Sequence, residues 1–303
     1  MKKITLAILL VSSLFSYSQD RCATDMYSDL LEKKYPEYAI ERQIVNYQTK
    51  KWIKNNPIIS GKSIITIPVV IHVVWNTNNE NISDAQIFSQ MDVLNADFRR
   101  TNSDATNTPS IWQSIAADSE IDFCLATTDP NGAATTGITR TETSQTSFSI
   151  NGSDMKSTSS GGIDPWDQND YLNIWVCDLS GGILGYATPP SNFNNPEDGV
   201  VIGYKYFGTI GSVQSPYNKG RTATHEVGHW LNLDHIWGNG GNCGNDNVSD
   251  TPTQEEENYG CNNISFPHNA NSCNTSNSNG DMFMNYMDYT NDACMNMFTL
   301  GQK

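Results

Sequence analysis

The sequence predicts an α+β fold in which a twisted, mixed β-sheet carries helices and is followed by a loop-rich C-terminal region. Three observations support this prediction: short apolar runs rich in β-branched residues, one clear amphipathic helical pattern, and a change to Asn-, Gly- and Ser-rich sequence after residue 236. Strands interspersed with helices form layered sheets. With 303 residues and 37% hydrophobic content, the chain can bury a substantial core in one large or two smaller domains.

Residues 1–18, "MKKITLAILLVSSLFSYS", have the layout of a secretory signal peptide, with two lysines, an apolar run and small residues at Ser16 and Ser18. The apolar run, Ile4 to Phe15, is shorter than the roughly 20 residues that cross a bilayer, which disfavours a membrane anchor. We therefore predict a secreted, extracellular protein without a membrane span, in a compartment where disulfides form.

The charge is unevenly distributed along the chain. The net charge is −15, yet residues 19–62 contain more basic than acidic side chains, and the acidic excess lies after residue 62. This pattern suggests a pro-segment, 19–62, that binds the acidic body electrostatically. A solvated N-terminal extension explains the charge equally well. Nucleic acid is not expected as a partner of so negative a surface.

Regular structure is expected from residue 64 onward, because residues 23–56 read only as a short helix and linker with little core. "IITIPVVIHVVW" (64–75) predicts a buried strand, within which His72 is expected to be buried and hydrogen-bonded. Ser83 and Gln86 form a capping box, followed by one apolar helix face. That face comprises Ile87, Met91, Leu94 and Phe98. Further strands are expected at 120–127, 171–179, 182–190 and 198–207, with a long surface excursion between the first two.

The stretch "HEVGHWLNLDH" (225–235) carries the clearest chemical signal. Residues four apart share one helix face, so His225 and His229 can bind one metal ion with Glu226 beside it. A surface helix with two histidines is the alternative. A continued helix would point His235 away, so the chain must turn, and Asn232 accepts the left-handed conformation that such a turn requires.

This stretch and "MNYMDYTNDACM" (284–295) together resemble the metzincin zinc proteases, specifically the pappalysin branch and its ulilysin and cytophagalysin-like members. The resemblance runs from about residue 21 to the end of the chain. It implies a metzincin-like zincin fold with an active-site helix. The catalytic domain would span 63–303, with an upper subdomain to about residue 235 and a lower subdomain at 236–303.

The resemblance also implies the site residues. His225, His229 and His235 would bind Zn²⁺ with one position open to water. Glu226 would be the general base in peptide-bond hydrolysis, and Tyr289 would stabilise the transition state. Met287 would form the methionine turn beneath the metal, although without the family it reads equally as core packing. The edge strand near 182–187 would pair with extended protein or peptide substrates.

Asp292 is the one indication of substrate preference. The resemblance places an aspartate at this position at the base of the S1′ pocket, where it would favour Arg or Lys at P1′. The alternative is that Asp292 only caps or solvates a loop.

The chain has seven cysteines. Spacing alone allows three pairings for the four in the tail, and the resemblance implies Cys243–Cys273 and Cys261–Cys294, which would hold the lower subdomain together. Cys124 and Cys177 are expected to be buried thiols. The resemblance further implies that Cys22 binds the zinc in a latent form, so that the protein's own pro-segment is its inhibitor; a free or intermolecularly paired thiol is the alternative.

The sequence supports four further expectations. Gly61–Lys62 is a candidate self-cleavage point. Asp246, Asp250 and Glu255 are candidate calcium ligands, with a solvated acidic loop as the alternative. "FTLGQK" ends the sequence where relatives continue into a helix, so we expect either a truncated sequence or a protein that lacks this helix. The rival functions are a non-catalytic adhesion protein with a vestigial zinc site and a disulfide-bonded surface protein.

Overall fold

The structure is a computed structural model that describes residues 21–56, 63–152, 154–238, 243–261, 264–270, 273 and 279–303. The expected signal peptide at 1–18 and the candidate cleavage point Gly61–Lys62 lie outside these residues.

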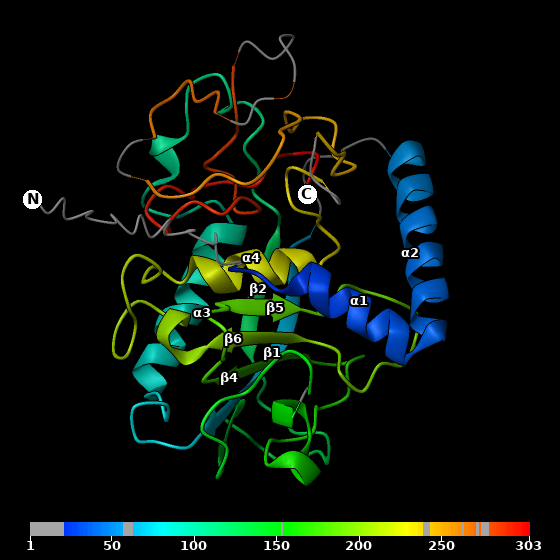
Figure 1. Ribbon diagram of the computed structural model, residues 1–303, viewed down its shortest axis with the longest axis vertical. Coiled ribbons are helices and arrows are strands. Elements are labelled where there is room, and N and C mark those ends of the chain that lie inside the picture. Colours follow the sequence, from blue (N-terminus) through cyan, green and yellow to red (C-terminus); the bar gives the residue numbers. More distant parts are fainter. Residues whose placement is uncertain are drawn as a thin grey trace, which may run out of the picture.

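A six-stranded mixed sheet forms the body of the protein, as predicted (Figure 1). The strand order is β2-β1-β4-β6-β5, and β3 also pairs with β1. All pairs are parallel except β5 with β6, so β5 is an antiparallel strand at one edge. The strands are β1 (Ile65–Trp75), β2 (Ile121–Leu125), β3 (Ile138–Glu142), β4 (Leu172–Cys177), β5 (Gly185–Ala187) and β6 (Val200–Gly203).

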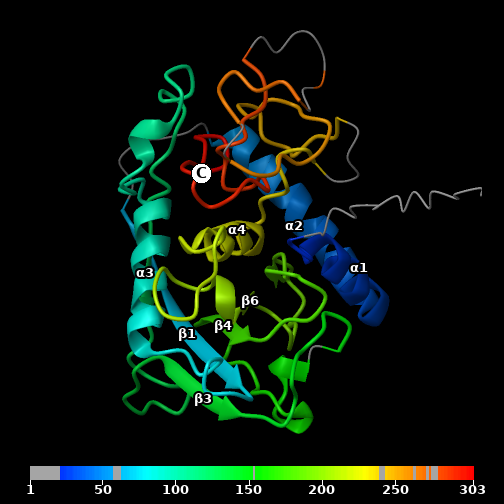
Figure 2. The ribbon, with the colours of Figure 1, turned by 60° about the vertical axis from the view of Figure 1, so that its left-hand side comes forward.

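Alternating side chains on the central strands build two separate cores, because successive residues of a strand face opposite sides of a sheet. On β4, Ile174 and Val176 join the core shared with α3 (Asp84–Phe98) and α4 (Arg221–Trp230). Trp175, between them, joins the core on the other side, which contains residues of the N-terminal segment. Figure 2 shows α3 alongside β1 and α4 between the sheet and the C-terminal region.

Helix α3 begins where the sequence predicts. The Ser83 hydroxyl accepts a hydrogen bond from the Gln86 backbone amide at 3.2 Å. The reciprocal half of the capping box is absent, since the Gln86 side chain donates instead to the carbonyls of Tyr204 and Phe207. His72 is fully buried as expected, with hydrogen bonds to Thr139 at 2.7 Å and Asn173 at 3.0 Å.

The prediction for residues 23–56 was wrong. The segment forms two helices, α1 (Thr24–Lys34) and α2 (Pro36–Asn55), rather than one short helix and a linker. Pro36 separates them, because the residue before a proline disfavours the helical region while proline suits the first turn of a new helix. The segment also contributes to the core through the buried side chains of Tyr27, Leu31 and Tyr38.

The expected surface excursion between 127 and 171 is also more ordered than predicted. It contains β3, which pairs with β1, and it buries Phe148 and Met155 in the core beneath the N-terminal segment. The strand expected over 198–207 ends at Gly203 and continues as a 3₁₀ turn. Cys177 is buried as expected, whereas Cys124 is exposed.

Two disulfides hold the C-terminal region, where the described residues form turns and isolated bridges after α4. The bonds are Cys243–Cys273 and Cys261–Cys294, the pairs that the family resemblance implies. Within the described part of the chain, every helix is too short or too polar to cross a membrane.

Candidate active site

Helix α4 carries the first three residues of the site on one buried face. His225, Glu226 and His229 are 5%, 1% and 2% exposed. After Trp230 the chain leaves the helix, and Asn232 has a φ of 78°, in the left-handed region. The turn expected at Asn232 is therefore present, and it brings His235 back so that its Nε2 lies 3.1 Å from Nε2 of His229.

Each of the three imidazoles has its outer nitrogen fixed by a hydrogen bond. His225 Nδ1 lies 2.7 Å from the Tyr286 carbonyl and His229 Nδ1 lies 2.8 Å from the Leu233 carbonyl. His235 Nδ1 lies 3.1 Å from the Asp25 carboxylate. Because these acceptors require a proton on Nδ1, each Nε2 is left with its lone pair directed inward.

The inner nitrogens fit a metal ion better than they fit one another. His229 Nε2 is 3.1 Å from the Nε2 atoms of both His225 and His235. Three lone pairs at such distances repel, unless a cation lies among them. Tetrahedral zinc with bonds of about 2.0–2.1 Å would place its nitrogen ligands roughly 3.3 Å apart. Burial also lowers the pKa of His225 to about 3, which favours the neutral imidazole that metals bind.

Met287 supports this site from below. It is fully buried, and a Cβ built on Gly228 of α4 would lie 2.5 Å from its sulfur. Any larger residue at 228 would require the buried methionine to shift, so glycine lets Met287 approach α4 between His225 and His229. The neighbouring Tyr286 carbonyl is the acceptor for His225, so the chain next to Met287 also orients this imidazole.

The N-terminal segment enters the site along the free edge of β5. The Leu184 amide donates to the Arg21 carbonyl at 2.8 Å, and the Ala23 amide donates to the Gly185 carbonyl at 3.0 Å. Cys22 and Gly185 form a parallel bridge. The edge expected to bind an extended peptide is thus paired with a segment of the same chain.

Cys22 lies at the open side of the three imidazoles. Its Sγ and one ligand nitrogen of each histidine lie within 4.8 Å of one another, the one cluster able to hold a metal that the described residues provide. The thiol also donates to Glu226 Oε2 at 3.2 Å. Burial, reinforced by the Glu226 carboxylate, raises the pKa of Cys22 well above its usual value, so a thiolate there needs a cation beside it.

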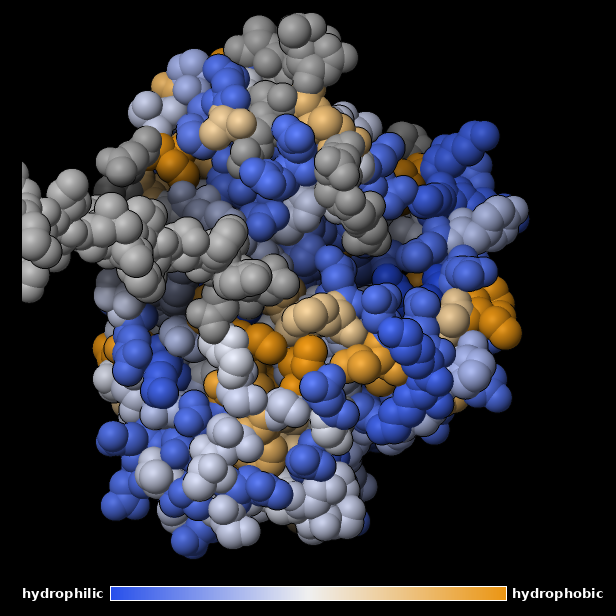
Figure 3. All heavy atoms as spheres, viewed as in Figure 1, coloured by the Kyte–Doolittle hydropathy of each residue, from blue (hydrophilic) through white to orange (hydrophobic). Residues whose placement is uncertain are grey.

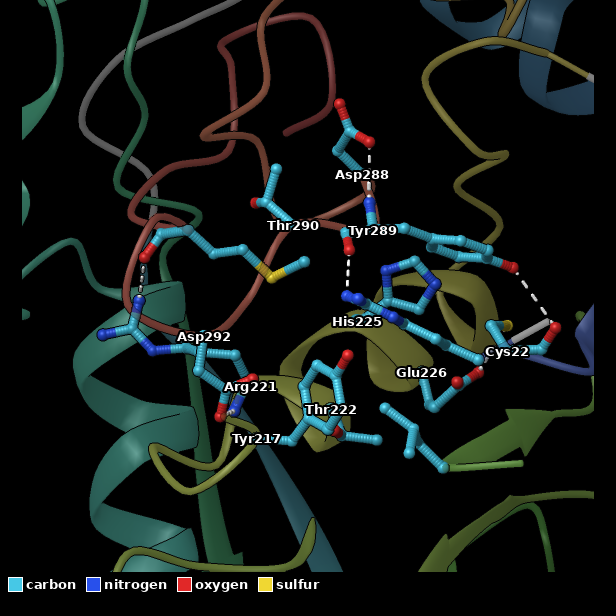
Figure 4. Close-up of a pocket in the computed structure, with 13 residues that line it drawn as sticks. Cys22, Tyr217, Arg221, Thr222, His225, Glu226, Asp288, Tyr289, Thr290 and Asp292 are labelled. Atoms are coloured by element: carbon cyan, nitrogen blue, oxygen red, sulfur yellow. Dashed lines mark hydrogen bonds between the residues drawn. The ribbon is translucent and has the colours of Figure 1, made fainter. Parts of the chain in front are cut away.

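Glu226 is covered by the same segment. Besides the thiol, the Thr24 hydroxyl donates to Glu226 Oε2 at 2.9 Å. Burial raises the pKa of Glu226 to about 7. Figure 4 shows Cys22 and Glu226 together at one side of the pocket, with Tyr289 above them.

Tyr289 reaches the same point from the C-terminal region. Its hydroxyl donates to the Cys22 carbonyl at 3.2 Å, and its ring centroid lies 5.6 Å from that of His225. Trp237 stacks on His235 with centroids 4.4 Å apart, which fixes the plane of the third imidazole. The three imidazoles, Cys22 and Tyr289 are therefore all buried, each at most 6% exposed.

Asp292 lies at the opposite side of the pocket, beside Tyr217 (Figure 4). Its Oδ2 accepts hydrogen bonds from the backbone amides of Lys219 at 2.7 Å and Arg221 at 3.3 Å, at the start of α4. Burial raises the pKa of Asp292 to about 6. Asp292 thus caps a helix, as the alternative interpretation held, and also lines the pocket.

Arg21 occupies the space next to Asp292. Its guanidinium lies 4.5 Å above the Tyr217 ring centroid and 4.7 Å from that of Tyr259. It donates to the Tyr289 carbonyl, and Asp292 is among the acidic groups whose field acts on it. A cation from the N-terminal segment therefore already fills an acidic, aromatic pocket.

The turn at Asn232 is also bound by α2. Arg42 Nη1 donates to Asn232 Oδ1 at 2.6 Å, and Asn232 Nδ2 donates to Asn46 Oδ1 at 3.2 Å. The side chain of the residue that turns the metal-binding segment is thus held by the N-terminal segment, a role that glycine could not fill.

The candidate calcium ligands are not assembled in the described residues. Asp246 accepts from Val248 and Thr251, and Asp250 accepts from Thr299 and Gly301. These carboxylates and Glu255 form no cluster with ligand atoms close to one another.

Several contributors escaped sequence reasoning. Thr24, Asp25 and Arg42 reach Glu226, His235 and Asn232 respectively. The only sequence signal was the position of Thr24 and Asp25, two and three residues after Cys22. Their contacts depend on how the segment is registered against β5, which a local pattern does not indicate.

Comparison with known proteins agrees with this geometry. A family model described as pregnancy-associated plasma protein-A matches residues 157–303. An extracellular metalloprotease of Arthroderma otae is 31% identical over 245 residues, which cover 78% of this chain and 75% of the relative. An extracellular metalloprotease of Pyricularia oryzae is 32% identical over 256 residues, covering 82% and 76%.

Two solved structures resemble the whole fold. Tannerella forsythia mature mirolysin in complex with a cleaved peptide has a TM-score of 0.77 and 56% identity, covering 80% of this chain and 90% of that one. A Tannerella forsythia promirolysin mutant has a TM-score of 0.82 and 50% identity, covering 93% and 90%. The larger share covered by promirolysin indicates that residues of the N-terminal segment have counterparts in that proenzyme.

The turn at Asn232 can be tested with a matched pair of substitutions. Asn232→Gly and Asn232→Val both remove the contacts to α2, but only valine resists a positive φ, at a cost of roughly 1–3 kcal/mol. We expect Asn232→Gly to bind zinc as tightly as the unaltered protein and Asn232→Val to bind it about tenfold more weakly or worse, measured by titration against a competing chelator. Equal affinities for the two variants would contradict the role of the turn.

Proposed function

The chain belongs to the pappalysin family of metalloproteases and is a metalloendopeptidase; on this premise we propose that it is a secreted zinc enzyme made in a latent form. Relatives named extracellular metalloprotease and the signal-like residues 1–18 support secretion. The single observation that carries the proposal is the convergence of three oriented imidazoles and one carboxylate at a point covered by Cys22.

His225, His229 and His235 are the residues that would hold zinc. Zinc bound there would lower the pKa of water at the open position to about 7 and polarise the carbonyl of the scissile bond. The fixed Nδ1 contacts of His225 and His229 come from the catalytic body itself, so they would persist when the N-terminal segment leaves. Only the Asp25 contact of His235 would be lost.

Glu226 would act as general base. Its Oε2 lies 3.2 Å from the Cys22 sulfur, and in the mature enzyme water would take the place of that sulfur. Glu226 would accept a proton from this water and later return it to the leaving amine. Its position next to His225 on α4 would keep its carboxylate beside that water for both transfers.

Tyr289 would stabilise the developing oxyanion. Its hydroxyl now donates to the Cys22 carbonyl, which shows that the donor reaches a carbonyl oxygen lying next to the metal site. A substrate carbonyl presented there would receive the same hydrogen bond, and the bond would strengthen as negative charge develops.

Latency would depend on residues 19–62 as a pro-segment. Cys22 would supply the fourth zinc ligand, Thr24 would hold Glu226, and α2 would bind the turn at Asn232. The basic character of the segment favours its binding to an acidic body. Activation would require cleavage between segment and body, for which Gly61–Lys62 stays the candidate.

Substrate preference would follow from Asp292. The contacts of Arg21 support this proposal, because its guanidinium lies 4.5 Å and 4.7 Å from the ring centroids of Tyr217 and Tyr259. When the pro-segment leaves, Arg or Lys at P1′ would take the same place, with Asp292 as its counter-ion.

The general-base role predicts that Glu226→Gln abolishes hydrolysis and spares metal binding. The amide cannot accept the proton, so peptide cleavage should fall by about 10²-fold or more. The variant, freed of its pro-segment by added active enzyme and repurified, should retain one zinc per chain. Glu256→Gln, at an exposed position, is the control and should cleave normally. Substantial cleavage by Glu226→Gln would exclude this residue as the base.

The pocket role predicts that Asp292→Asn changes selectivity. Asparagine keeps an acceptor for the α4 amides but loses the charge, so kcat/KM for a P1′ Arg peptide should fall about tenfold or more relative to a P1′ Leu peptide. In the unaltered enzyme the same ratio should fall below about pH 6, because the raised pKa of Asp292 leaves the carboxyl protonated there. A ratio that neither the substitution nor acid changes would rule out Asp292 as the selective group.

A further inference from the structure

Tyr27 of α1 fills a polar pocket on the catalytic body. The side chain is 1% exposed, and its ring centroid lies 4.5 Å from that of Tyr186. Its hydroxyl donates to Glu197 Oε2 at 2.7 Å and accepts a hydrogen bond from Lys156 Nζ at 3.1 Å. We call the site formed by Lys156, Tyr186 and Glu197 the phenol pocket.

The phenol pocket is held in place by contacts within the catalytic body. Lys156 Nζ donates to the Glu197 carbonyl at 2.6 Å, and the Thr188 hydroxyl donates to the same oxygen at 2.7 Å. The Glu197 amide donates to Asn195 Oδ1 at 3.0 Å. None of these contacts uses the N-terminal segment, so the pocket should keep its shape when α1 is released.

The pocket lies beside the strand that would bind substrate. Tyr186 is the middle residue of β5, between Gly185, which pairs with Cys22, and Ala187, whose amide donates to Thr24 Oγ1 at 2.9 Å. The N-terminal segment thus runs from Arg21 beside Asp292, past Cys22 at the histidine cluster, to Tyr27 in α1. If Asp292 marks the P1′ side, the phenol pocket is on the amino side of the scissile bond.

We propose that, in the mature enzyme, the phenol pocket is a substrate subsite that selects a tyrosine a few residues before the cleaved bond. The proposal rests on the proposed peptidase function and adds a second point of selection to the Asp292 pocket. An extended chain rises about 3.3 Å per residue, so a tyrosine two to five residues before the bond would reach the far end of β5.

The pocket chemistry favours tyrosine over other side chains. One ligand atom must donate to a carboxylate and accept from an amine, which a phenol hydroxyl does. Phenylalanine would fill the space but leave both buried groups without that partner. A lysine would place its amine against Lys156, and a carboxylate would face Glu197. Burial lowers the pKa of Lys156 to about 7, and in either protonation state the amine has an N–H to donate.

The second carboxylate oxygen of Glu197 also binds the N-terminal segment. Oε1 accepts from Lys34 and from the Tyr35 hydroxyl, at the end of α1 where Lys34 is largely exposed. Three groups of the N-terminal segment therefore converge on this one carboxylate. Hydrophobic residues also lie at the surface on the side of the molecule where α2 runs (Figure 3). In α2 itself, Ile40 and Ile53 are 59% and 53% exposed.

The test compares tyrosine and phenylalanine in peptides cut by the matured enzyme. Each peptide would have Arg at P1′ and would carry either Tyr or Phe at one of the second to fifth positions before the bond. We expect one position where kcat/KM for Tyr exceeds that for Phe about tenfold, because the hydroxyl bonds two polar groups. In Glu197→Ala this ratio should fall to about twofold or less, while Glu256→Ala should leave it unchanged.

The ratio is insensitive to partial misfolding, because both peptides meet the same enzyme preparation. The proposal would be overturned if no position favoured Tyr, or if the preference survived in Glu197→Ala. Failure to cleave any peptide would instead contradict the proposed function. The phenol pocket would then be tested in the latent protein. Tyr27→Phe should speed the removal of residues 21–56 by trypsin severalfold compared with the control Tyr47→Phe, because Tyr47 is exposed. Equal rates for the two variants would contradict the role of the pocket in binding a phenol.

Discussion

The whole site depends on one backbone constraint, the positive φ at Asn232 between the second and third histidines. A continuing helix would carry His235 away, whereas the turn places three Nε2 atoms around one point. Backbone carbonyls then orient two of the rings, so the lone pairs are directed before any metal binds. Glycine at 228 lets Met287 lie close beneath the helix without being displaced.

The same centre explains why the N-terminal segment binds as it does. It pairs with the open edge of β5, sets Cys22 over the imidazoles and places Arg21 beside Asp292. These are the positions that a substrate would need, so one segment occupies the edge, the metal site and the side-chain pockets together. Helix α2 adds a contact to the turn itself, from Arg42 to Asn232.

Local rules predicted the features that depend on few neighbouring residues. The four-residue spacing of His225 and His229, the tolerance of asparagine for positive φ and the cap at Ser83 are properties of short stretches, and the structure contains each of them. The two helices of the N-terminal segment were missed because their stability comes from Tyr27 and Leu31 packing against a sheet distant in sequence. The phenol pocket was missed for the same reason, since a buried lysine is recognisable only once its tertiary partners are known.

The central claim is that three histidines and Cys22 can share one zinc ion, and X-ray absorption at the zinc edge tests it most directly. In the zinc-loaded latent protein we expect three nitrogen neighbours at about 2.0 Å and one sulfur at about 2.3 Å, with the sulfur replaced by a light atom after maturation or in Cys22→Ser. A latent protein whose zinc has no sulfur neighbour, or fewer than three imidazoles, would contradict the account.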